Sequence, residues 1–187
     1  MQEARPEYES ALSFLWHRWK YRDHQYIGDF LFESNELKKY GGFYYLPYAW
    51  GSDDITSFRA SLTNGIVNTQ KPCFQYRENS STISNTLNAC SKADAVLLEK
   101  EWYEIEIPNI IIQNKQDGIF FSLINEMFCS HFDKKIKTLL RGDLYNNPNK
   151  ILEWRKKKNH NISSLYMFKT CISMIWKLVK DKIKRMI

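Results

Sequence analysis

The chain has 187 residues, 43% of them hydrophobic and 15% aromatic, and a net charge of +6. This composition excludes a largely disordered protein, because a chain of this length and apolar content can bury a single core. The cysteines form no Cys-x-x-Cys pair, no signal-like apolar segment follows the N-terminal MQEARPEYES, and no run of about 18 uncharged apolar residues occurs. We therefore expect a cytoplasmic protein without a metal site, a cofactor or a membrane-spanning helix.

The N-terminal region predicts a helix over residues 6–22. Pro6 is well placed as its first residue, because the missing amide hydrogen of proline is not needed at that position. The polar side of this helix would carry His17, Arg18 and Lys20. Its apolar side chains recur every three or four residues, as on one face of a helix: Tyr8, Leu12, Leu15, Trp16 and Trp19.

An aromatic stretch follows, from Tyr26 to Trp50. Short apolar runs are separated here by glycine and proline, a pattern typical of strands or of packed irregular segments. Its aromatic side chains suit a stacking platform for bases or sugars, but a place in the core is the preferred interpretation. Six residues are concerned: Tyr40, Phe43, Tyr44, Tyr45, Tyr48 and Trp50.

The middle of the chain carries the clearest strand signal. In WYEIEI, over residues 102–107, Trp102, Glu104 and Glu106 would project to one face and the apolar residues between them to the other, which predicts a strand with two faces. A turn is predicted over residues 114–118, so that another apolar run can pair with this strand. A short strand at 73–77 and a helix at 83–93 are expected before it. The sequence therefore predicts a small, aromatic-rich antiparallel sheet in the middle of the chain.

The C-terminal third changes to helical periodicity. Apolar residues spaced by three or four predict a helix from Phe120 to a C-cap at Gly142. A short basic helix or turn is expected near residues 150–158, and a basic amphipathic helix over 162–187. We predict one α+β domain over residues 1–187, with a mixed part over 1–117 and a helical, basic part over 118–187.

Positive charge is concentrated at the C-terminal end. Residues 150–187 contain eleven Lys and Arg against two acids, whereas residues 1–149 contain sixteen against nineteen. Such a field attracts polyanions, so nucleic acid, an anionic membrane surface and an acidic protein are all candidate partners. We expect a non-catalytic binding protein whose first partner is nucleic acid. The predicted binding residues are Arg155, Lys156, Lys157, Lys158, Lys177, Lys180, Lys184 and Arg185, with Lys134, Lys135 and Lys137 on the preceding helix.

An enzyme is the alternative, and RKKKNH offers one version of it. Arg155 and His160 are separated by four residues just before the last predicted helix, which resembles the R-x4-H signature of HEPN-type ribonucleases. The resemblance implies a metal-independent ribonuclease in which Arg155 binds phosphate and His160 transfers a proton. It also implies a homodimer with the histidine facing a second copy. Three lysines stand between the two residues where the family has a polar residue and then apolar ones.

A second enzyme hypothesis rests on Arg59, Ser81-Thr82 and Glu104-x-Glu106. Their order is similar to the arginine, S-T-S and E-x-E layout of ADP-ribosyltransferases. The resemblance implies that Arg59 contacts dinucleotide phosphates, that Ser81 supports the nicotinamide site, and that Glu106 stabilises the ribosyl centre. It requires both glutamates on one face of a strand.

Overall fold

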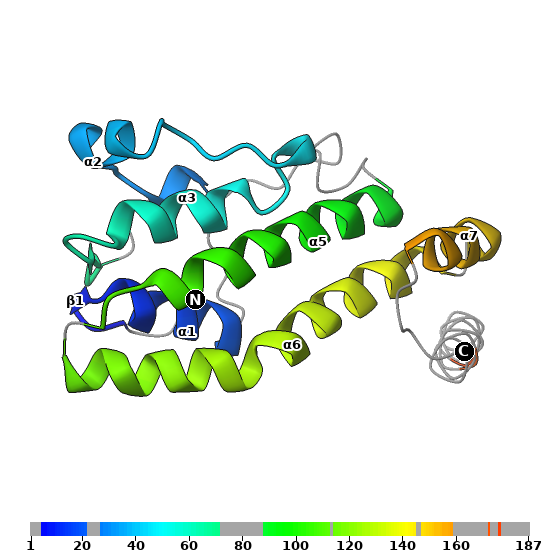
Figure 1. The fold of residues 1–187 in the computed structure, drawn as a ribbon. Coiled ribbons are helices and arrows are strands. Elements are labelled where there is room, and N and C mark those ends of the chain that lie inside the picture. Colours follow the sequence, from blue (N-terminus) through cyan, green and yellow to red (C-terminus); the bar gives the residue numbers. More distant parts are fainter. Residues whose placement is uncertain are drawn as a thin grey trace, which may run out of the picture. The chain divides into compact units, whose positions relative to one another are not determined.

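The computed structural model describes residues 5–21, 27–71, 88–112, 114–144 and 147–158, together with Ile172 and Trp176. These residues are mostly helical and include a small two-stranded antiparallel sheet (Figure 1). In chain order the elements are β1 (Tyr8–Glu9), α1 (Ala11–Tyr21), a 3-10 turn (Ile27–Asp29), α2 (Ser34–Lys39), a 3-10 turn (Pro47–Ala49), α3 (Ser52–Ser61), β2 (Ile66–Val67), α5 (Ala89–Glu106), a 3-10 turn (Ile107–Asn109), α6 (Lys115–Asp143) and α7 (Pro148–Lys158).

The chain divides into two compact units. Unit 1 comprises Met1–Thr86 and Ala95–Phe132, and unit 2 comprises Leu87–Asp94 and Asp133–Ile187. Both α5 and α6 contribute residues to each unit. Each unit has a core of its own, described separately below, and the organisation of residues 1–187 as one domain stays a prediction.

The core of unit 1 is built from α1, α3, α5 and the first part of α6. Trp19 of α1 is buried and makes edge contacts with Tyr103 of α5 and Phe132 of α6, with ring centroids 5.2 and 5.4 Å apart. Its ring also stacks on His131, at 4.7 Å and 15°. Offset and edge-on pairs of this kind add to the stabilisation from buried area. The other large buried side chains include Phe14, Leu15, Ile55, Phe58, Val96 and Ile124.

The start of the first helix differs from the prediction. Residues Tyr8 and Glu9 form a strand that pairs with Val67 and Ile66, so the helix begins at Ala11 and not at Pro6. Ser10 ends the strand and caps the helix, because its Oγ accepts the backbone N–H of Ser13 at 3.2 Å. The only sheet among the described residues therefore joins residues 8–9 to 66–67 and does not lie in the middle of the chain.

The strand predicted over residues 102–107 is wrong, because residues 102–106 belong to α5 and Ile107 begins the 3-10 turn that follows. Val96, Glu99, Tyr103 and Ile107 are almost completely buried, at the three- and four-residue spacing of a helix. The turn predicted over 114–118 is also wrong. Asn114 accepts the N–H of Asp117 through Oδ1 and donates to Asp117 through Nδ2, both at 2.9 Å, which caps the start of α6.

The core of unit 2 joins the start of α5, the second half of α6 and α7. Its buried side chains are Ala89, Cys90, Ala93, Ile136, Leu140, Leu144, Ile151 and Trp154. The helix predicted from Phe120 is part of α6, which begins earlier, at Lys115, and continues through Gly142 to Asp143, so the C-cap predicted at Gly142 is wrong. The short basic helix is confirmed as α7. The strand predicted at 73–77 and most of the final helix lie outside the described residues.

The described part of the aromatic stretch forms short helices and irregular chain and no strand, and Leu46 is its one buried residue among those whose burial the structure describes. Within residues 27–50 the described segments are a 3-10 turn, α2, a second 3-10 turn and irregular chain. None of the six aromatic residues named above is buried, and Phe43, Tyr45 and Tyr48 are exposed. The preferred interpretation of these residues as core is therefore wrong.

Among the described residues no helix combines the length and apolar character needed to cross a membrane.

Candidate functional site

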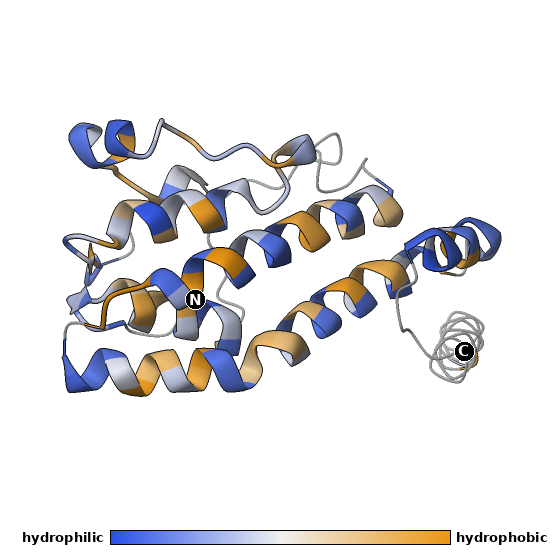
Figure 2. Cartoon of the chain, in the orientation of Figure 1, coloured by the Kyte–Doolittle hydropathy of each residue, from blue (hydrophilic) through white to orange (hydrophobic). Residues whose placement is uncertain are grey.

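Helix α7 presents the predicted basic residues from a fixed position in unit 2. Ile151 and Trp154 bury one face of the helix, and the indole Nε1 of Trp154 donates a hydrogen bond of 2.8 Å to Asp94 Oδ1. Because both buried residues lie on one side, the remaining surface of α7 is free to carry charge. Figure 2 shows that most of this helix is hydrophilic.

The four cations at the end of α7 differ in their surroundings. Lys158 forms an ion pair of 3.2 Å with Asp94, and Arg155 is half-buried and interacts with other groups. Lys156 and Lys157 are exposed, and neither forms an ion pair in the described part of the chain. A cation in the last turn is favoured by the helix dipole, by about 0.3–1 kcal/mol. That attraction accounts for a cation here but supplies no anionic partner for the two exposed lysines.

Two further lysines of unit 2 are exposed and without an ion pair in the same way. Lys134 on α6 and Lys150 on α7 are exposed, and within the described ranges they too form no ion pair. By contrast, Lys137 lies 3.7 Å from Asp133. The four exposed lysines Lys134, Lys150, Lys156 and Lys157 are called the unit 2 lysines below.

The division into units is also a division of charge. Unit 2 contains sixteen Lys and Arg and five Asp and Glu, a net charge of +11, whereas unit 1 contains eleven and sixteen, a net charge of −5. A surplus of this size cannot be neutralised by the acids of unit 2 itself. An external polyanion would lower the repulsion among the lysines.

Unit 1 contains a cluster of buried charges that sequence patterns did not reveal. Arg18 of α1 donates to Asp54 Oδ1 of α3 through Nε at 2.8 Å, and Nη2 lies 2.7 Å from the same oxygen. Burial lowers the pKa of Arg18, but the nearby carboxylates of Asp54, Asp53 and Glu99 outweigh it and raise the pKa. Burial, followed by the charge of Asp54, raises the pKa of Asp53.

The same cluster continues onto α5. Glu99 is completely buried, and a Cβ at Gly51, whose φ is +82°, would lie 2.7 Å from Glu99 Oε2. Complete burial and the charge of Glu99 raise the pKa of Tyr103 well above its ordinary value. The hydroxyl of Tyr103 has no hydrogen-bond partner in the part of the chain that the structure describes. The cluster thus lies where α1, α3 and α5 pack together, and Glu99 leaves no room for a side chain at Gly51.

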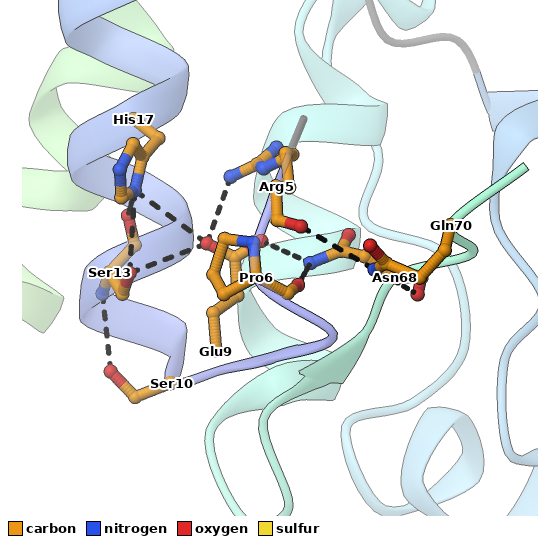
Figure 3. Close-up of polar contacts among 8 residues, drawn as sticks. All are labelled: Arg5, Pro6, Glu9, Ser10, Ser13, His17, Asn68 and Gln70. Carbon is orange, nitrogen blue, oxygen red and sulfur yellow. Dashed lines mark hydrogen bonds and ion pairs between the residues drawn. The ribbon is translucent and has the colours of Figure 1, made fainter. Parts of the chain in front are cut away.

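A second polar network surrounds Glu9, as Figure 3 shows. Its buried carboxylate accepts hydrogen bonds from Arg5 at 3.0 Å and from Asn68 at 2.8 Å, which ties the N-terminal segment to β2. Ser13 and His17 of α1 also approach this carboxylate, which brings a serine, a histidine and an acid together.

This set does not have the geometry of a catalytic triad. The Nδ1 atom of His17 lies 2.7 Å from the backbone oxygen of Ser13, and since a carbonyl only accepts, Nδ1 carries the proton. Ser13 Oγ and Glu9 Oε2 both approach this same nitrogen, at 3.3 and 3.7 Å. A triad needs the serine and the acid on opposite ring nitrogens. The network is therefore structural.

The ADP-ribosyltransferase layout is not formed. Glu104 and Glu106 lie on a helix, where two positions turn the side chain by about 200°, so they do not share a face. Arg59 donates to the backbone oxygen of Tyr40, within unit 1. Ser81 lies outside the described residues. The E-x-E strand, on which this hypothesis depended, is thus replaced by α5.

The other predicted site residues are only partly described. Arg155 is on α7, whereas His160 lies outside the described residues, as do Lys177, Lys180, Lys184 and Arg185. The ribonuclease hypothesis therefore stays a prediction. No group of three or more His, Cys, Asp or Glu residues in the described ranges has an arrangement that could hold a metal ion.

Comparison of the chain with protein-family models, with curated proteins and with solved structures gave no significant match. Function is therefore inferred from the charge and exposure of the described residues.

Proposed function

We propose that the protein binds nucleic acid, without catalysing a reaction, and that the unit 2 lysines contact its phosphates. One observation supports this most strongly: these lysines are exposed and form no ion pair in the described part of a unit whose net charge is +11. A nucleic acid backbone offers regularly spaced negative charge and releases bound counterions when lysines replace them. Such binding needs neither a pocket nor a catalytic group.

The rigid attachment of α7 supports the proposal further. Trp154 and its hydrogen bond to Asp94 fix the helix, so the ammonium groups of Lys156 and Lys157 start from a defined backbone position. Association then costs little backbone ordering. Both lysines also lie outside the core, so their replacement tests binding without disturbing the fold.

The test is the salt dependence of binding to a labelled single-stranded oligonucleotide, measured by fluorescence anisotropy. For the double variant Lys156→Gln/Lys157→Gln we expect weaker binding and a slope of log K against log salt that is shallower by about 1.4, because each phosphate contact to a single strand contributes about 0.7.

A matched control comes from unit 1. Lys38→Gln/Lys115→Gln removes the same charge from exposed positions outside unit 2 and should leave the slope unchanged. Equal slopes for the wild type and the Lys156/Lys157 variant would refute the assignment of these lysines. Cleavage of an RNA oligonucleotide by the wild type, abolished by His160→Ala, would replace this proposal with the ribonuclease hypothesis.

A second candidate function is binding to an anionic membrane surface. It is favoured by Ile172 and Trp176, two helical residues four positions apart whose side chains are 42% and 62% exposed. Exposed apolar side chains on a basic helix suit insertion between lipid headgroups. Sedimentation with phosphatidylcholine vesicles, with and without phosphatidylserine, tests this function. Trp176→Ala should weaken vesicle binding and leave oligonucleotide binding unchanged; no loss with vesicles would exclude the membrane function.

A further inference from the structure

The segment between α2 and α3 exposes a row of aromatic rings. Residues 43–50, called the aromatic loop, run back alongside α3 (Figure 1). The side chains of Phe43, Tyr45 and Tyr48 are 60%, 81% and 52% exposed. Single exposed apolar residues are common, but three large rings within six positions form a local cluster of contact surface.

The backbone of this loop is fixed by α3. Thr56 Oγ1 accepts the N–H of Tyr44 at 3.0 Å, and Ser52 Oγ accepts the N–H of Leu46 at 2.9 Å. Leu46 is buried, whereas its neighbour Tyr45 is exposed. The loop therefore alternates between a side that packs on unit 1 and a side that is presented outwards.

The turn that follows also fixes the backbone at Tyr48. Tyr48 and Ala49 have φ values of +61° and +55°, in the left-handed region that residues with a side chain seldom adopt. Backbone hydrogen bonds from Ala49 to Leu46 and from Trp50 to Pro47 close the turn, at 2.9 and 3.2 Å. Strained backbone of this kind is found where a functional side chain must be positioned.

Positive charge lies beside the inner rings of the same segment. The guanidinium carbon of Arg59 is 5.1 Å from the ring centre of Tyr40 and 5.5 Å from that of Tyr44, and Lys39 Nζ is 5.4 Å from the ring centre of Tyr40. Arg59 forms no ion pair with a carboxylate among the described residues. Its guanidinium donates to the backbone oxygen of Tyr40 and lies against these two inner rings, so the segment carries a cation that no acid among the described residues neutralises, although unit 1 as a whole is acidic.

We infer that the aromatic loop stacks unpaired bases, so that the protein prefers single-stranded to double-stranded nucleic acid. The identity of this partner rests on the proposed function. Exposed flat rings on a backbone that is fixed before binding suit a single strand, because every base has a face that can stack. Bases inside a duplex are already stacked on each other and do not present that face.

The experiment compares Tyr45→Leu with Tyr45→Phe, using anisotropy with a labelled single strand, the corresponding duplex, and an abasic strand with the same number of phosphates. Leucine keeps an apolar side chain but removes the ring, whereas phenylalanine keeps the ring. We expect Tyr45→Leu to weaken binding of the single strand by about 5- to 100-fold. Tyr45→Phe should bind like the wild type, and all three proteins should bind the abasic strand equally.

The salt slope separates this inference from the proposed function. Loss of stacking lowers the binding constant without removing a phosphate contact, so Tyr45→Leu should keep the wild-type slope. Wild-type affinity of Tyr45→Leu for the single strand would overturn the inference, and so would an equal loss on the abasic strand. A wild type without salt dependence would instead contradict the role of the unit 2 lysines. Tyr45 is largely exposed, so thermal unfolding should be unchanged in both variants.

Discussion

The two units handle charge in opposite ways. In unit 1 the ionic groups of Arg18, Asp54 and Glu99 are removed from solvent and placed beside one another. The unit 2 lysines, by contrast, remain exposed and form no ion pair with an acid in the described ranges. A buried charge is costly unless it is paired, whereas an exposed lysine costs little to leave unpaired. The first arrangement therefore serves stability, and the second leaves charge available for a partner.

This contrast separates charge that the packing of the fold explains from charge that it does not explain. The carboxylates of unit 1 outnumber its bases, yet those in the cluster lie inside the packing of α1, α3 and α5. The surplus of positive charge in unit 2 is not explained by packing in this way. Removing charge from the two units should therefore produce different kinds of defect.

The largest effect is expected from Arg18→Met. This change removes the guanidinium that interacts with the carboxylates of Asp53, Asp54 and Glu99, so the free energy of unfolding should fall by about 3 kcal/mol. That value is at the low end for a buried pair because the Arg18 and Asp54 side chains keep 17% and 14% of their exposure. Chemical denaturation measures it.

A matched substitution in unit 2 sharpens the contrast. Lys157→Met removes the same charge from an exposed position and should change the free energy of unfolding by less than about 0.5 kcal/mol. If both variants lost stability equally, the distinction between structural and functional charge would be lost.

A smaller effect is expected from Asp53→Asn. Because the pKa of Asp53 is raised, the folded chain holds its proton more tightly than the unfolded chain. The stability that this provides is complete below the ordinary pKa of 3.8 and is lost as the pH rises through the raised value. Asparagine cannot ionise, so the variant does not lose this stability as the pH rises. Its side-chain oxygen can still accept the N–H of Asp54.

The variant should therefore gain stability over the wild type between acidic and neutral pH, by less than about 1 kcal/mol. Unfolding curves recorded across this range check the sign. A variant that became steadily less stable than the wild type with rising pH would show that Asp53 is stabilising as an anion.

Helices α6 and α7 could be predicted because their apolar spacing is local and regular. Only the start of α5 was covered, by the helix predicted over residues 83–93. The rest could not be predicted, because Glu99 is fully buried in the apolar stripe of the helix, where a charged residue is normally taken to indicate the surface. Its burial depends on a cluster containing Arg18 and Asp54, which are 36 positions apart in the sequence. The alternation in residues 102–107 therefore indicated the two-residue period of a strand instead of the period of a helix.

The candidate site shows the same limit. The lysines of α7 were predictable as a charge run in the sequence. The exposure of Phe43, Tyr45 and Tyr48 was not, because it depends on which side of the aromatic loop bonds to Ser52 and Thr56. Asn114 and Asp117 carried the signal of a turn, but the same side-chain chemistry caps a helix.

The salt dependence of the wild-type protein tests the central claim most directly. If the four unit 2 lysines all reach phosphates, the slope of log K against log salt for a single-stranded oligonucleotide should be about −3 or steeper. Binding that does not change with salt, or no binding at low salt, would contradict the account.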